Sequence, residues 1–158
     1  MARDVRRSWG GVRPLSRRLT VMHLYRPVGL TELRLIADLA WAAFPPRLPI
    51  QPIFYPVLNL DYARFIAEEW NTKDPVSGYC GFVTSFEIDD AFAARYPVQT
   101  VGRRSHQELW VPSEEMDLFN LHLMGGIQVL EAYFGPLCEV TLETAVPGAH
   151  NLPRNAGR

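Results

Sequence analysis

Three residues whose side chains can carry out chemistry lie in or next to apolar runs of the sequence. Arg26 lies in a first run, Tyr55 lies in a second, and Glu108 lies in a third, late in the chain. A guanidinium is a planar fork of donors for phosphate groups, an aromatic face stacks on a flat ring, and a fixed carboxylate stabilises developing positive charge. These three residues are therefore the first candidates for a catalytic site.

Each candidate also has an ordinary structural interpretation. An arginine such as Arg26 most often forms a surface ion pair, and a tyrosine such as Tyr55 in an apolar run most often packs in the core. Glu108 alternates with its neighbours along an expected strand, which is typical of an exposed carboxylate. The residue types alone leave both interpretations open for all three.

The first strand and helix position Arg26. Residues 23–28 (HLYRPV) are predicted to form a strand. Thr31 is a suitable N-cap for a helix whose apolar face includes Leu33 and Ile36. This helix must end before Pro45, because proline lacks an N–H donor and constrains the residue before it.

A second strand and the clearest amphipathic helix follow. Residues 53–58 form an apolar run in which Pro56 either makes the strand an edge strand or ends it early. Asn59 can cap a helix whose apolar face includes Ala63 and Ala67. This helix is expected to end at the polar run NTKDP.

The rest of the chain is predicted to consist mostly of strands with short helices. Gly125 and Gly126 are expected to end the last helix, and Trp41, Trp70 and Trp110 are expected in the core. The order strand, helix, strand, helix and then mostly strands is typical of an α+β fold and not of a doubly wound sheet. The expected strands are 79–88, 98–101, 106–111, 127–134 and 138–142, and the expected helices are 89–95 and 114–124.

The composition indicates one ordinary globular domain, which we place at residues 21–146. The chain has 158 residues, of which 47% are apolar and 21% charged, so a core can form without metal or disulfide support. Cys80 and Cys138 have no metal-ligand spacing and are expected to be reduced thiols. No stretch is apolar enough to span a membrane. We therefore expect a soluble, cytoplasmic protein without a metal and without a membrane partner.

The charge is unevenly distributed along the chain. Residues 1–20 contain six arginines against one aspartate, a local charge of +5, and the net charge is −1, so the other residues sum to −6. This mildly acidic body argues against a broad nucleic-acid surface. Residues 1–20 are predicted to be a disordered basic arm and residues 147–158 a disordered tail. We expect Met22 to be the natural start of the protein, with a basic interaction tail or a targeting peptide as the alternative for the arm.

Four stretches of the chain carry a resemblance to a known family. YRPVGL, FPPRLP, QPIFYPVLN and HQELWVP resemble small bacterial proteins labelled ADP-ribosylation/crystallin J1, and the order of elements resembles the ADP-ribosyltransferase fold. The resemblance covers about residues 22–124. It implies an α+β fold that is ADP-ribosyltransferase-like, with two small antiparallel-rich sheets and flanking short helices. The chain lacks the length and the acidic metal-binding clusters of the all-helical ADP-ribosyl hydrolases.

The resemblance also implies roles for individual residues. In the wider family a first-strand cation anchors NAD, a second-strand aromatic residue supports the nicotinamide pocket, and a late glutamate stabilises an oxocarbenium-like transition state. These roles pass to Arg26, to Tyr55 or its neighbour Phe54, and to Glu108. The residue two positions before the glutamate helps to select the acceptor in some members, and here it is His106, an imidazole able to hold or deprotonate an acceptor.

The remaining implied contacts complete the expected NAD site. Pro27 is next to Arg26, and the loop PPRLPIQP adds Arg47 and Gln51. The resemblance thus implies NAD as substrate, no metal, and transfer of ADP-ribose to an unknown acceptor, possibly a protein, or to water. The alternatives are a non-catalytic nucleotide- or protein-binding module on the same fold and an effector of a bacterial conflict system. Pro27-Val28 after the cation and the missing Ser-Thr-Ser motif depart from the wider family.

Overall fold

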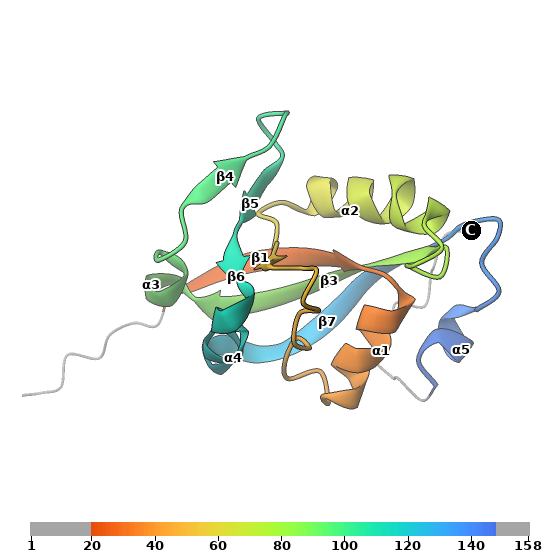
Figure 1. Ribbon diagram of the computed structural model, residues 1–158, viewed down its shortest axis with the longest axis horizontal. Helices are drawn as coiled ribbons and strands as arrows, with labels where there is room; N and C mark the ends of the chain where they lie inside the picture. The colour runs from red at the N-terminus through yellow and green to blue at the C-terminus, as the bar shows by residue number, and fades with distance from the viewer. Residues whose placement is uncertain (1–19, 148–158) are drawn as a thin grey trace, which may run out of the picture.

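Three long antiparallel strands form the main sheet of the computed structural model, which describes residues 20–147 (Figure 1). They are β1 (Val21–Val28), β3 (Cys80–Asp89) and β7 (Leu123–Phe134), in the order β1-β3-β7. β3 pairs along both edges and is almost entirely buried, which explains why it places apolar side chains on both faces, Phe82 in one cluster and Val83 in the other.

Four short strands lie beside the β1 edge of this sheet. β2 (Ile53–Phe54) pairs with β6 (Val111–Pro112), and β4 (Val98–Thr100) pairs with β5 (Gln107–Leu109). Val57 bridges Tyr25 of β1 on one side and Glu108 of β5 on the other. The short strands therefore extend the main sheet beyond β1. The expected strand 53–58 is therefore reduced to the two residues of β2 and the two bridges of Val57, since Pro56 has no N–H to donate.

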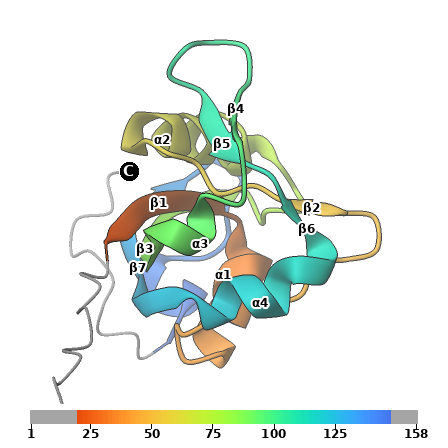
Figure 2. The same ribbon diagram turned by 90° about the vertical axis from the view of Figure 1, so that its left-hand side faces the viewer.

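Helices cover both faces of the main sheet. α2 (Leu60–Glu69) packs against β1, β3 and β7 on one face, while α1 (Leu30–Asp38) and α4 (Met116–Leu121) lie on the other (Figures 1 and 2). The shorter elements are α3 (Asp90–Ala93), α5 (Leu142–Ala145) and the 3-10 turns η1 (Asn71–Lys73) and η2 (Ser113–Glu115). The protein is thus α+β, with small antiparallel sheets and short helices. Within the described residues no helix has both the length and the apolarity to cross a membrane.

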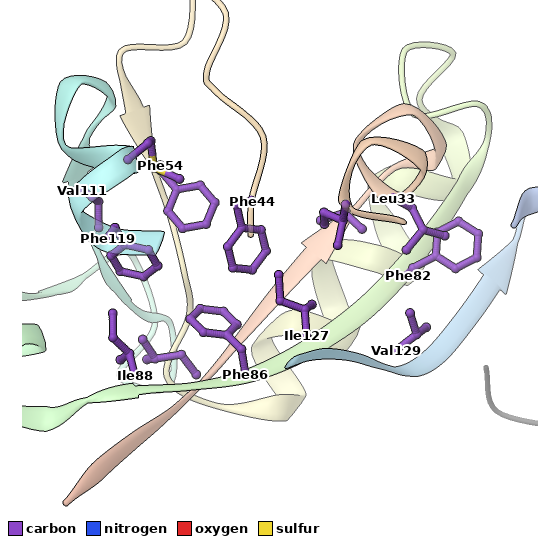
Figure 3. Close-up of a cluster of buried hydrophobic side chains, with 14 of the residues drawn as sticks. Leu33, Phe44, Phe54, Phe82, Phe86, Ile88, Val111, Phe119, Ile127 and Val129 are labelled. Atoms are coloured by element: carbon purple, nitrogen blue, oxygen red, sulfur yellow. The ribbon is translucent and has the colours of Figure 1, made fainter. Parts of the chain in front are cut away.

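Two separate apolar clusters result from this arrangement. The main core lies between the sheet and the α1–α4 side, and interlocking phenylalanine rings dominate it (Figure 3). A smaller α2-side cluster contains Val57, Tyr62, Ala63, Ala67 and Val83, with Tyr25 packed against it. Because strand side chains alternate, Leu24 and Val28 enter the main core while Tyr25 faces α2.

The helix starts show which local predictions hold. Asn59 does cap α2, since its Oδ1 accepts the N–H of Tyr62 at 2.7 Å. Gly29, and not Thr31, is the N-cap of α1, and it makes no side-chain cap bond. The N–H of Leu30 instead donates to the carbonyl of Ser77 at 3.0 Å, so a tertiary contact satisfies a donor at this helix end.

The last third of the described chain differs most from its prediction. α4 ends at Leu121, and Gly125 and Gly126 lie inside β7, not at a helix end. Gly125 has φ of +82°, and the register between β3 and β7 shifts at this point, so these glycines accommodate a β-bulge. The strand predicted at 138–142 does not form. The predictions of a disordered arm and a disordered tail concern residues 1–19 and 148–158, which lie outside the described residues.

Gly81→Ala is expected to lower the free energy of unfolding by about 1–3 kcal/mol, a typical cost of overpacking. A Cβ at Gly81 would lie 2.5 Å from the carbonyl oxygen of Ala67 and 2.8 Å from its Cα, where β3 passes under α2. Urea unfolding measures the loss. Gly126→Ala is the matched control, because its Cβ would come no closer than 3.6 Å to another atom, the carbonyl oxygen of Trp41. Equal losses in the two variants would contradict the close packing of α2 on β3.

Candidate functional site

Arg26, Glu32 and Arg47 form a buried charged cluster where β1 ends and α1 begins. Arg26 donates two hydrogen bonds to Glu32, from Nη2 to Oε1 at 2.8 Å and from Nε to Oε2 at 3.1 Å. Arg47 Nη1 donates to the same Oε1 at 3.3 Å. Their side chains are only 11%, 19% and 10% exposed in that order. The interpretation of Arg26 as a surface ion pair is therefore wrong.

Phe54 of β2 and the following residue, Tyr55, pack against this cluster. The Arg26 guanidinium lies over the ring of Phe54 at 4.5 Å, and its Nη1 donates to the carbonyl oxygen of Tyr55 at 3.2 Å. Arg47 lies farther from the same ring, at 5.9 Å. Phe54 thus contacts the predicted cation through its ring, whereas Tyr55 contacts it only through the backbone.

The cluster carries an excess of positive charge. Two guanidiniums share one carboxylate, so one positive charge has no counter-ion among the three side chains. Burial, and next the charge of Arg26, lowers the pKa of the Arg47 guanidinium from its ordinary value. Arg47 Nε is buried and has no hydrogen-bond partner within residues 20–147. A buried donor without a partner costs about 1–3 kcal/mol, which a ligand can recover.

A cavity of about 350 Å³ lies beside this cluster. Its wall brings together four of the residues predicted to bind the cofactor, Arg26, Pro27, Arg47 and Gln51, with Glu32 among them. The end of β1, the start of α1, the loop at 45–51 and the segment at 71–77 supply the lining. Phe54, Tyr55, His106 and Glu108 do not line it. The structure therefore brings together only the β1 and proline-rich loop residues of the predicted site.

Glu108 lies elsewhere and is buried, with 8% of its surface exposed. Its Oε2 accepts the hydroxyl of Tyr62 at 3.0 Å and its Oε1 accepts the indole N–H of Trp110 at 2.8 Å. Burial, followed by the charge of Glu108, raises the pKa of Tyr62 to about 12, so its hydroxyl stays protonated near neutral pH. The interpretation of Glu108 as an exposed strand carboxylate is wrong. It is instead a carboxylate fixed by two donors.

Aromatic rings surround Glu108 on the α2 side of the sheet. His106 stacks on Tyr62 with ring centroids 4.2 Å apart and an interplanar angle of 7°. Tyr55 meets Trp110 edge to face at 6.3 Å, and both rings are partly exposed. Trp110 is 42% exposed and Trp70, at the C-cap of α2, is 60% exposed, so the prediction that both pack in the core is wrong. Trp41 does pack, half-buried, against the main core.

The strands separate Arg26 from Glu108. Tyr25, Val57 and Glu108 lie opposite one another across two bridges, so their side chains share the α2 face. Arg26 follows Tyr25 in β1 and faces the other side. Tyr55 connects the two faces, since its carbonyl accepts from Arg26 while its ring meets Trp110. The three predicted catalytic residues are neighbours in the ladder, but their functional groups do not converge.

Sequence reasoning missed two functional groups of the cavity. Glu32, in the first turn of α1, pairs with both arginines, and its place one turn into the helix after a strand bearing an arginine was the available clue. Asn71 also lines the cavity, and its Oδ1 is buried without a partner within residues 20–147. Nothing in the polar run NTKDP distinguished it from an ordinary loop residue.

A second cavity, of about 410 Å³, lies between α1 and residues 145–147. Arg34 lines it, but the guanidinium donates to the carbonyl oxygens of Ala145 and Thr144 at 3.0 and 3.2 Å. This arginine therefore ties α5 to α1. None of the predicted site residues lies there.

Comparison with known proteins adds no relative. No protein-family model matches the chain, and no curated protein or solved structure matches it either. The α+β architecture thus comes from the structure, and the resemblance to the ADP-ribosyltransferase fold stays a prediction from the four sequence stretches and the predicted order of elements.

Proposed function

We propose that this protein binds NAD or a closely similar dinucleotide, with the pyrophosphate held by Arg26 and Arg47. One observation carries the proposal. Two guanidiniums share a single carboxylate at the wall of a 350 Å³ cavity, and a buried donor of Arg47 lacks a partner within the described residues. The sequence resemblance supplies the identity of the ligand.

The chemistry of the cluster suits a pyrophosphate. Guanidinium forks bind phosphate oxygens with charge-assisted, often bidentate hydrogen bonds. The second guanidinium offers an anion further donors at this end of the cavity, while the carboxylate of Asp74 lies in the lining as well and bonds to Ser77. The cavity falls within the range of small-molecule sites and accommodates part of a dinucleotide, so the remainder of the ligand would extend beyond it.

Catalysis at Glu108 is the second candidate, and the geometry of that carboxylate favours it. Glu108 is buried and fixed by two donors among partly exposed rings, as a group that stabilises an oxocarbenium-like sugar has to be. NAD bound at Arg26 would have to reach the α2 face around the segment at 55–57. The non-catalytic binding module therefore has the more direct support. ADP-ribose transfer or NAD hydrolysis requires in addition that the bound NAD extends from Arg26 to Glu108.

Arg47→Ala is expected to weaken NAD binding at least tenfold, because it removes a charge-assisted contact and the excess positive charge. The Arg26–Glu32 pair survives in this variant, so the fold persists. Calorimetric titration with NAD measures the affinity, and nicotinamide release in the same samples separates the enzyme from the binding module.

Arg95→Ala is the matched control for this experiment. Arg95 pairs with Glu115, neither residue lines the cavity, and the loss of Arg95 should leave NAD affinity unchanged. Absence of NAD binding by the unaltered protein, or equal affinity in the Arg47→Ala variant, would contradict the proposed function.

A further inference from the structure

Two residues that line the cavity, Arg47 and Asn71, carry an unused donor and an unused acceptor. Within residues 20–147, the buried side-chain polar atoms without a partner are Arg47 Nε and Asn71 Oδ1. Both residues line the same cavity, although Arg47 lies in the proline-rich loop and Asn71 begins η1. Neither atom is exposed to solvent, so a molecule in the cavity becomes the partner of either one only when neighbouring side chains of the lining shift.

A chain of hydrogen bonds fixes the orientation of the Asn71 amide. The Asp74 carboxylate only accepts, and Ser77 Oγ donates its single proton to Asp74 Oδ2 at 2.7 Å. Ser77 Oγ can therefore only accept from Asn71, and it does so from Nδ2 at 2.9 Å. Asp74 is itself anchored, since its Oδ1 accepts the N–H of Val76 at 3.1 Å. The amide cannot flip without losing this chain, so the free atom is an acceptor.

Close packing holds this loop against the arginine cluster. Ser77 lies so near Gly29 that a Cβ there would be 2.7 Å from the Ser77 Cα. The carbonyl oxygen of Ser77 also accepts the N–H of Leu30 at the start of α1. The segment Asn71–Ser77 thus packs directly on the turn between Arg26 and Glu32. Asn71 and the two arginines therefore line one cavity.

We propose that the cavity selects ligands that carry an N–H₂ donor for Asn71 Oδ1 in addition to an anionic group for the arginines. Asn71 is then a specificity-determining residue, and Asp74 and Ser77 position its amide. The identity of the anion rests on the proposed function, whereas the need for a donor rests on Asn71 and its two neighbours. In NAD two groups supply such a donor, the carboxamide of nicotinamide and the amino group of adenine.

The test compares affinities for NAD with those for two analogues. Deamido-NAD replaces the carboxamide by a carboxylate, and nicotinamide hypoxanthine dinucleotide lacks the amino group of adenine. The unaltered protein should bind one of the two at least tenfold more weakly than NAD, and that analogue identifies the group facing Asn71. ADP-ribose, which has no nicotinamide, provides a fourth ligand for the same titration.

Asn71→Ala should weaken NAD binding and remove the preference for NAD over the discriminated analogue. Gln128→Ala is the matched control, because it removes an exposed amide on β7 and should keep the preference. If Asn71→Ala does not fold, Ser77→Ala replaces it. That change frees the amide to turn its Nδ2 toward the ligand and should lower the same preference.

The outcomes separate this inference from the proposed function. Equal affinity of the unaltered protein for NAD and both analogues, or a preference that survives in Asn71→Ala, would overturn the inference while leaving NAD binding in place. Failure of NAD and ADP-ribose alike to bind would overturn both.

Discussion

Glu32→Gln is expected to lower the free energy of unfolding by about 3–5 kcal/mol, one of the largest effects of a single substitution in this chain. The substitution keeps the shape of the side chain but removes the only negative charge that Arg26 and Arg47 share in their cluster. Two nearly buried guanidiniums then repel each other without compensation. Urea unfolding of the variant and the unaltered protein measures the difference.

Inorganic pyrophosphate should restore much of the lost stability. An anion that binds only the folded protein stabilises it in proportion to the logarithm of its concentration over its dissociation constant. The variant offers two unpaired guanidiniums, so pyrophosphate should bind it roughly tenfold or more tightly than it binds the unaltered protein, where Glu32 competes.

Glu69→Gln is the control for this prediction. Glu69 pairs with Lys73 on the exposed side of α2, and such pairs contribute about 0.3–0.5 kcal/mol. A Glu32→Gln variant as stable as the Glu69→Gln variant would show that the cluster does not depend on this carboxylate. Equal stabilisation of the variant and the unaltered protein by pyrophosphate would show that the anion binds elsewhere.

Glu108→Gln is expected to reduce the rate of nicotinamide release by about 100-fold to 1,000-fold if NAD is cleaved at this carboxylate. The fixed negative charge next to the developing oxocarbenium ion is lost, while the size of the side chain is kept. Glutamine is preferable to alanine here, because its amide oxygen can accept the Trp110 N–H and its amide N–H can donate to the Tyr62 hydroxyl oxygen, whereas alanine would leave both without a partner. Single-turnover assays at saturating NAD measure the effect.

Glu115→Gln is the matched control for Glu108→Gln. Glu115 also accepts a tyrosine hydroxyl, that of Tyr96 at 3.1 Å, but it lines neither the cavity nor the ring cluster around Glu108. Release that persists unchanged in Glu108→Gln would exclude this carboxylate from catalysis. Binding of NAD without any release by the unaltered protein would establish the binding module.

Local sequence patterns determined the elements that carry the site. The apolar face of α2 and its Asn59 cap are set by residues within a few positions of each other, so the helix was predictable. β1 and β3 followed from apolar and β-branched runs. Of the six residues predicted to bind the cofactor, Arg26, Pro27, Arg47 and Gln51 meet at one cavity, whereas Phe54 and Tyr55 do not line it.

Only the tertiary structure decided which face of the sheet each group occupies. Alternation along a strand says that neighbours diverge, but the face of Glu108 relative to Arg26 depends on the register of Tyr25, Val57 and Glu108 across two bridges. Pairing with β3 likewise drew Gly125 and Gly126 into β7. The burial of Glu32 and the orientation of the Asn71 amide depend on partners far away in the chain. The sequence therefore supplied Arg26 and Arg47 as candidates, and long-range register and packing determined that Glu32 and Asn71 join them at one cavity.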